Sequence, residues 1–146
     1  MAMVDELQFS QAKARLSALM DEVVHRDQLK AVRRDRGIDE VMYLLPRGLL
    51  AAAVETAQVV VDYVPGEEGI GLWVNDLNIG AHGADMAEAR RHLVDEVCAY
   101  VANFLAELPV YLTWPDRARL VPHVLCLAVA RDDAELAHML FDRPVA

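Results

Sequence analysis

The sequence predicts an α+β fold of two modules, and three observations support this prediction. Apolar residues recur at helical spacing in some segments and alternate in others, glycine and proline clusters separate those segments, and charge is unevenly divided along the chain. The length of 146 residues allows one ordinary domain or two very small ones. We place the first module at residues 1–55 and the second at residues 57–146.

The first module begins with a short extended segment, residues 7–9, and one helix. Ser10 is the expected N-cap of that helix, because its hydroxyl can accept a hydrogen bond from an unpaired backbone N–H. The helix is predicted over residues 11–25. Its apolar residues recur at helical spacing, at Ala12, Leu16, Leu19, Met20, Val23 and Val24.

A β-hairpin is predicted over residues 28–45. Asp35-Arg36-Gly37 is the expected turn, since glycine readily adopts a positive φ. The return strand covers residues 41–45, and a short apolar helix over residues 49–54 follows. The main elements of the first module therefore have the order β-α-β-β.

The second module is predicted to contain three strands and a long helix, in the order β-β-β-α. Two strands flank a turn cluster at residues 65–69, and a third covers residues 79–82. Asp85 and Glu88 have the spacing of a capping box at the start of the helix, and Pro109 is expected to end it.

The last third of the chain predicts a helical tail after one strand. The strand is expected at residues 110–114 and a buried helix at residues 121–130, and Asp132 or Asp133 is expected to cap a final helix. Cys98 and Cys126 lie in apolar, helix-like surroundings outside any CxxC pair. We therefore expect buried thiols rather than a disulfide or a zinc site.

The net charge of −9 arises in one part of the chain. Residues 1–48 hold eight basic and eight acidic side chains, whereas residues 49–146 hold six basic and fifteen acidic ones. Such a division suits a protein that contacts an anion with one end and a basic partner with the other, although two solvated surfaces would give the same counts. No apolar stretch is long enough to span a membrane and the N-terminus lacks a signal-peptide pattern, so we expect a cytoplasmic protein without membrane contact.

Residues 7–23, LQFSQAKARLSALMDEV, resemble the N-terminal half of the Phd/YefM (prevent-host-death) antitoxins. Residues 31–37, AVRRDRG, and 41–46, VMYLLP, are similar to the basic turn and apolar strand that follow in that family. The resemblance implies that this module forms a homodimer or higher homo-oligomer, binds operator DNA and represses transcription of its own operon.

Residues 59–64, VVVDYV, and 70–77, IGLWVNDL, resemble the first strands of a HicB-like antitoxin domain. Residues 80–83, GAHG, and 85–89, DMAEA, continue its order into a long helix. This implies a β-β-β-α fold related to a degenerate ribonuclease H core. Together the two resemblances imply an antitoxin of a type II toxin-antitoxin system, which neutralises a cognate protein toxin by direct binding. The acidic charge of the second module indicates that this toxin is basic.

DNA binding requires cations close to phosphates and donors that reach base edges. The resemblance places DNA contact at the start of the first helix, and the basic residues near the hairpin turn suit a phosphate backbone. The predicted DNA-binding residues are Ser10, Gln11, Lys13, Arg15, Arg33, Arg34 and Arg36. A polar helix face and a solvated turn are the alternative interpretation.

Acidic residues in loops of the second module are the predicted partner-binding residues: Glu67, Glu68, Asp76 and Asp85. Their alternative role is to keep the protein soluble. Three large aromatic residues are expected in the core or in an interface: Tyr63, Trp73 and Trp114.

A ribonuclease H-like fold also raises the alternative of a metal-dependent nuclease that uses Asp62, Asp76, Glu88 and Asp95. The capping box explains Glu88, and no glycine-rich phosphate loop or nucleophile motif is present. His82, His92 and His123, taken with the cysteines, match no metal-binding spacing. We therefore expect no catalytic residue, metal or cofactor. A non-enzymatic structural or ligand-sensing protein without a toxin partner is the other alternative to an antitoxin.

Overall fold

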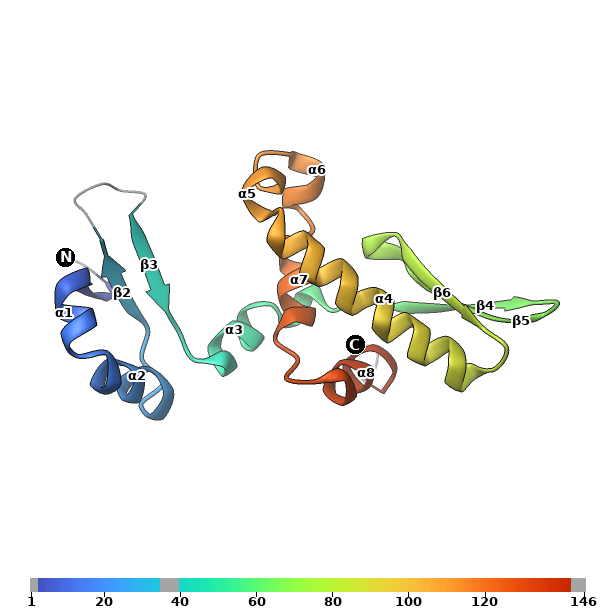
Figure 1. Cartoon of the computed structure of the whole chain (residues 1–146), viewed down its shortest axis with the longest axis horizontal. Coiled ribbons are helices and arrows are strands. Elements are labelled where there is room, and N and C mark those ends of the chain that lie inside the picture. The colour runs from blue at the N-terminus through green and yellow to red at the C-terminus, as the bar shows by residue number, and fades with distance from the viewer. Residues whose placement is uncertain (1–2, 35–39, 143–146) are drawn as a thin grey trace. The chain divides into compact units, whose positions relative to one another are not determined.

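The computed structural model describes residues 3–34 and 40–142, and its contacts divide the chain into two compact units. Unit 1 is Met1–Ala53 and unit 2 is Val54–Ala146. Each unit contains a three-stranded sheet together with helices (Figure 1). The predicted α+β class is therefore confirmed.

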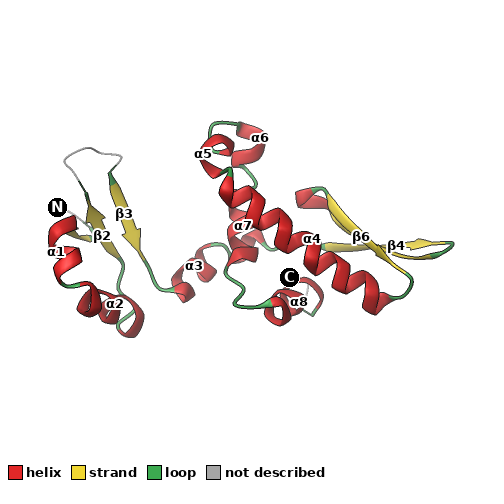
Figure 2. Cartoon of the chain, in the orientation of Figure 1, coloured by secondary structure: helices red, strands yellow, loops and turns green. Residues whose placement is uncertain are grey.

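The sheet of unit 1 has a central strand paired with two others, and Figure 2 shows its hairpin part, residues 30–33 beside residues 41–44. Strand β1 (Asp5–Gln8) runs parallel to β2 (Lys30–Arg33), which pairs antiparallel with β3 (Val41–Leu44). Because parallel strands need a crossover connection, helices lie between β1 and β2. The hairpin predicted over residues 28–45 is present, and its expected turn, including Arg36, lies outside the described residues.

Two helices, α1 (Phe9–Ala14) and α2 (Leu16–His25), occupy the segment where the sequence predicted a single one. They meet at Arg15, whose backbone N–H donates to the carbonyls of both Gln11 and Ala12, at 3.1 and 3.3 Å. Such shared bonds are common at helix ends. The prediction of one helix was wrong because the apolar spacing continues through this break.

The start of α1 also differs from the prediction. The helix begins at Phe9, so Ser10 lies inside its first turn and is not the N-cap. Gln8 occupies the cap position, and its N–H donates to Oε1 of Gln11 at 3.1 Å. Later in unit 1, α3 (Arg47–Ala53) begins earlier than the helix predicted over residues 49–54.

A small core holds the helices against one face of the sheet in unit 1. Ala12, Leu19 and Val32 are buried there, and Leu7 and Leu44 pack against them. Leu19 is only 1% exposed. The core therefore joins α1 and α2 to all three strands.

An exposed apolar face runs along α2. Leu16, Met20 and Val24 follow one another at intervals of four residues, and their exposed fractions are 53%, 54% and 58%. Leu19 and Val23, from the same predicted apolar stripe, are buried. The stripe is thus divided between the core and a face that unit 1 itself leaves uncovered.

The sheet of unit 2 is an antiparallel meander. It consists of β4 (Val61–Gly66), β5 (Gly69–Val74) and β6 (Ile79–Gly83), so the three predicted strands are present. Gly69 has a φ of 147°, which a residue with a side chain rarely adopts. Short 3₁₀ helices precede β4 and β6: η1 (Glu55–Ala57) and η2 (Asn75–Leu77).

One long helix, α4 (Met86–Ala106), lies against β5 and β6 (Figure 1). Asp85 caps it as predicted, because its Oδ1 accepts the N–H of Glu88 at 2.8 Å, and the Glu88 carboxylate accepts the N–H of Ala84 at 2.7 Å. At Gly83 on β6, a Cβ atom would come within 2.3 Å of the backbone nitrogen of Ala89. Glycine therefore permits this close approach between α4 and the sheet.

The tail of unit 2 is helical throughout residues 108–141 apart from its short connections. The strand predicted at residues 110–114 was wrong, because Pro109 is well tolerated in the first turn of a helix and begins a new one after α4. Asp132 caps the last helix as predicted, with its Oδ1 accepting the N–H of Glu135 at 2.8 Å. The tail helices are α5 (Leu108–Tyr111), α6 (Pro115–Ala118), α7 (Val121–Ala128) and α8 (Asp133–Phe141).

The core of unit 2 joins α4 to the sheet on one side and to α7 and α8 on the other. Leu93, Val97 and Phe104 are the buried residues of α4 that occupy its centre. Cys126 on α7 is buried as predicted, whereas Cys98 on α4 is exposed. The prediction for Cys98 was wrong because an apolar neighbourhood in sequence does not fix which side of a helix a residue occupies.

Candidate functional site

The helix residues predicted to contact DNA lie on the surface of unit 1. Ser10, Gln11 and Lys13 are exposed on α1, and Arg15 is exposed between α1 and α2. The side-chain oxygen of Gln11 accepts the N–H of Gln8, which leaves its amide NH₂ group as a donor. Within the described part of the chain, Lys13 pairs with no carboxylate.

Glu22 on α2 is the centre of an ion-pair cluster. Arg15 reaches Glu22 Oε1 at 3.3 Å, and Nζ of Lys30 lies 3.0 Å from Glu22 Oε2 and 2.7 Å from Asp5 Oδ2. Hydrogen bonds from Lys30 lower the pKa of both carboxyl groups, and the same bonds raise the pKa of Lys30. Arg15 is therefore partly neutralised by a carboxylate of its own unit.

Sequence reasoning did not single out Lys30. Lys30 is only 7% exposed, and lysines are rarely buried to this extent unless carboxylates pair with them. The parallel register pairs Asp5 with Lys30 and, two residues later, Leu7 with Val32. Because side chains alternate along a strand, both pairs occupy the sheet face that the helices cover. The signal in the sequence was that Asp5 and Lys30 each precede, by two residues, an apolar residue that faces the core, Leu7 and Val32.

Arg33 forms a two-pronged ion pair with Glu6 on the neighbouring strand. Its Nε lies 2.5 Å from Oε1 and its terminal nitrogen 3.0 Å from Oε2. The hydrogen bond from Arg33 lowers the pKa of Glu6. Arg33 was predicted to contact DNA, but its positive charge is matched within unit 1, so it is a weaker candidate than the count of basic residues indicated.

Arg34 is exposed at the end of β2 and contacts α1. Its guanidinium carbon lies 5.8 Å from the centre of the Phe9 ring, which is within the range of a cation–π interaction. Its backbone N–H donates to the carbonyl of Glu40 at 2.9 Å. No carboxylate of the described residues pairs with its side chain. The structure thus brings Arg34 to the helix that also presents Lys13.

The acidic residues predicted to bind a partner divide between the two ends of the sheet in unit 2. Glu67 and Glu68 form the turn between β4 and β5, and Asp85 follows β6 at the same end, since Ile70 pairs with Gly83. Asp76 lies in η2 at the other end and accepts the N–H of Val60 at 3.4 Å. The structure therefore places Glu67, Glu68 and Asp85 at the same end of the sheet and Asp76 at the opposite end.

Three of the four carboxylates of the nuclease alternative have separate structural partners, and Asp95 is exposed on α4. Asp62 accepts a hydrogen bond from the side chain of Asn75, Asp76 accepts the N–H of Val60, and Glu88 belongs to the capping box of α4. Across residues 3–34 and 40–142, no three His, Cys, Asp or Glu side chains form a group that could hold a metal ion.

The histidines and large aromatic residues also have local contacts. Nδ1 of His92 lies 2.7 Å from the carbonyl of His82, and Nδ1 of His123 lies 2.8 Å from that of Ala57. Three large aromatic residues were expected in the core or in an interface, and none of them is buried in the core. Their exposed fractions are 52%, 37% and 52%, so the interface position stays a prediction: Tyr63, Trp73 and Trp114.

A family model described as "Antitoxin of toxin-antitoxin, RelE / RelB, TA system", of the PHD-like type, matches residues 3–141. The chain belongs to this antitoxin family. The antitoxin component predicted from the sequence is therefore confirmed at the level of the family.

A solved structure of an antitoxin part of a putative toxin/antitoxin system from Syntrophomonas wolfei subsp. wolfei has a similar fold. The comparison gives a TM-score of 0.74 and 15% sequence identity, and covers 94% of this antitoxin and 97% of that chain. No curated protein matches the sequence. Among the described residues of this antitoxin, no helix is long and apolar enough to cross a membrane.

Proposed function

We propose that this antitoxin binds a cognate protein toxin directly and represses its own operon as a homodimer on operator DNA. The observation that supports this most strongly is the family match over residues 3–141. The two units differ in charge, which suits DNA binding by one and binding of a basic toxin by the other. Residues 1–53 hold eight basic and eight acidic side chains, whereas residues 54–146 hold six basic and fifteen acidic ones. Unit 1 is the proposed Phd/YefM-like part, and unit 2 is the proposed HicB-like part.

The exposed face of α2 is the proposed dimer contact. Leu16, Met20 and Val24 are each more than half exposed and occupy one side of the helix. Several large apolar residues in one row favour association over exposure to water. A second copy of the same face would cover them, because two-fold symmetric contacts use the same surface twice.

Lys13 and Arg34 are the proposed main phosphate contacts of unit 1. Both are exposed, and neither pairs with a described carboxylate, whereas Arg15 and Arg33 each have a carboxylate partner within 3.3 Å. An unpaired cation gains more from a phosphate than one that must first leave a carboxylate. One unit offers few phosphate contacts, which would give little affinity for DNA. A dimer would double their number.

Unit 2 is the proposed toxin-binding part. Its excess of nine acidic side chains, the difference between fifteen and six, complements a basic protein. Glu67, Glu68 and Asp85 lie at one end of its sheet, where they provide an acidic surface.

Two measurements on the full chain test this proposal. Co-expression with the protein of the adjoining gene should give a complex that co-purifies at fixed stoichiometry, and the chain should bind DNA from upstream of its own gene more tightly than scrambled DNA of equal length. Binding to neither would contradict the proposal and favour the structural or ligand-sensing alternative. Metal-dependent RNA cleavage that is lost in Asp76→Asn would favour a nuclease instead.

A further inference from the structure

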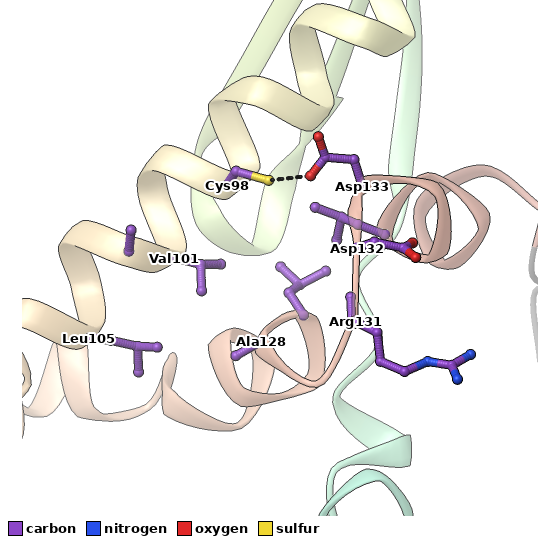
Figure 3. A pocket seen from close by; sticks show the side chains of 11 residues that line it. Cys98, Val101, Leu105, Ala128, Arg131, Asp132 and Asp133 are labelled. Carbon is purple, nitrogen blue, oxygen red and sulfur yellow. Dashed lines mark hydrogen bonds between the residues drawn. The ribbon is translucent and has the colours of Figure 1, made fainter. Parts of the chain in front are cut away.

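A pocket of about 310 Å³ lies in unit 2 between α4 and the connection from α7 to α8 (Figure 3). Its walls are apolar, with Val101 and Leu105 on α4, Leu127 and Ala128 on α7, and Leu136 on α8. Leu105 is 38% exposed at this surface. The volume is at the lower end of ligand-binding pockets, a size that suits a large apolar side chain better than an extended molecule.

One side of this pocket is polar and predominantly acidic. The thiol of Cys98 donates to Oδ1 of Asp133 at 3.7 Å, and Asp132 lies beside it (Figure 3). Arg131 also lines the pocket, but its Nε lies 3.1 Å from the Glu135 carboxylate. Among the described residues that line the pocket, Arg131 is the one basic side chain and its charge is matched, so the two aspartates give the rim an excess of negative charge.

The pKa of the Cys98 thiol is consistent with this negative rim. Partial burial, followed by the negative charges of Asp133 and Asp95, raises its pKa above the ordinary value of 9.0. The thiol is therefore protonated at neutral pH, and a reactive thiolate is disfavoured. A cation brought to this rim would meet the carboxylates of Asp132 and Asp133, while Arg131 already pairs with Glu135.

We propose that this pocket receives an apolar side chain of the cognate toxin, next to a toxin lysine or arginine that pairs with Asp132 and Asp133. The inference rests on the proposed function, since it gives the toxin-binding unit a specific contact point. Buried apolar anchors surrounded by complementary charge are where binding energy concentrates in protein interfaces.

Charge favours a toxin over a second copy of the antitoxin as the occupant. Residues 54–146 have a net charge of −9, from six basic and fifteen acidic side chains, so two copies of unit 2 would repel each other at an acidic rim. The rim instead complements a basic segment, and the apolar walls complement the side chain that such a segment would insert.

Filling the pocket tests the proposal with a matched pair of variants. Ala102 lines the pocket, whereas Ala99 is exposed on the same helix and does not line it. Ala102→Phe should weaken binding of the purified protein of the adjoining gene by about tenfold or more. Ala99→Phe should change that affinity by no more than about twofold.

Protection of Cys98 tests the same pocket without any substitution. Cys126 is 3% exposed, so N-ethylmaleimide should modify Cys98 first in the free antitoxin, as peptide mass spectrometry can establish. At a free concentration about ten times its Kd, the protein of the adjoining gene should slow this modification by about tenfold, because only the free antitoxin reacts.

The outcomes distinguish the two proposals. Slower Cys98 modification in the complex, together with a loss of affinity confined to Ala102→Phe, supports the pocket as the contact point. If the complex forms but Cys98 reacts at an unchanged rate and both variants bind equally, the pocket proposal is wrong and toxin binding is retained. If no complex forms with the wild-type chain, toxin binding and the pocket proposal both fail.

Discussion

Lys30 and Asp5 join the first two strands of unit 1 through a contact of 2.7 Å between Nζ and Oδ2. Glu22 on α2 shares the same ammonium group at 3.0 Å. One lysine therefore links β1, β2 and the helix that presents the proposed dimer face. Since the Arg15 guanidinium also contacts Glu22, the cluster orients the end of α1 as well.

The stability of unit 1 should depend on pH below about 5. The folded-state pKa values of Asp5, Glu6 and Glu22 are lowered from ordinary values of 3.8, 4.5 and 4.5. Their contribution is present above those values and is lost as pH falls through the lowered ones. Lys30 has a raised pKa, so its contribution is present below its ordinary value of 10.5 and is lost only above it.

Amide hydrogen exchange in β1 and β2 would measure this dependence. Protection should be constant through neutral pH and decrease as pH falls from about 5 to about 3. Lys30→Met should lower protection at pH 7 and reduce its change with pH, because Asp5 and Glu22 lose their shared partner. An unchanged pH profile in this variant would show that the cluster does not stabilise unit 1.

Met20→Asp should dissociate the proposed dimer. The substitution places a charge in the middle of the exposed face of α2, between Leu16 and Val24, where an apolar contact would have to desolvate it. Analytical ultracentrifugation should give a monomer mass for Met20→Asp and a dimer mass for Ala18→Asp, which changes an exposed residue of the same helix outside this row. Equal masses for the two variants would exclude this face as the contact.

Lys13→Ala and Arg34→Ala should weaken binding to upstream DNA more than Arg33→Ala does. Arg33 pairs with Glu6 through two contacts, whereas Lys13 and Arg34 pair with no described carboxylate. Loss of one phosphate contact per protomer should also lower the slope of log affinity against log salt by about 1 for each contact. Titrations at several salt concentrations measure both effects, and a larger loss in Arg33→Ala would reverse the assignment.

Asp85 has both a structural and a proposed binding role, and two substitutions separate them. Asp85→Ala removes the N-cap of α4 and should lower the free energy of unfolding of unit 2 by about 1 kcal/mol. Asp85→Asn keeps a capping side chain but removes the charge. Chemical denaturation should show a small effect of the asparagine, while calorimetry should show weaker binding to the adjoining gene's protein in both variants.

The long helix and its cap could be predicted from the sequence because their signals are local. Asp85 and Glu88 lie three residues apart, and the apolar face of α4 repeats over several turns. The division of the first helix at Arg15 had no such signal, since the apolar spacing continues across it. The sequence predicted that Pro109 ends the long helix. That Pro109 also lies in the first turn of a new helix, α5, depends on the packing of the tail and had no local signal.

The basic candidate site could be predicted only as a set of residues. Which of them keep an unpaired charge depends on contacts between residues distant in sequence, such as Arg33 with Glu6 and Lys30 with Asp5. The same holds for Arg34, whose position beside Phe9 depends on the hairpin reaching α1. Charge counts therefore located the basic segment but could not rank its members.

Growth rescue tests most directly whether the chain neutralises a toxin. The protein of the adjoining gene is induced in a host lacking both genes, with or without the full chain, and colony counts are compared. Arrest of growth by that protein alone, with recovery when the soluble chain is co-expressed, is the predicted result. Arrest that persists in the presence of the soluble, folded chain would contradict direct neutralisation.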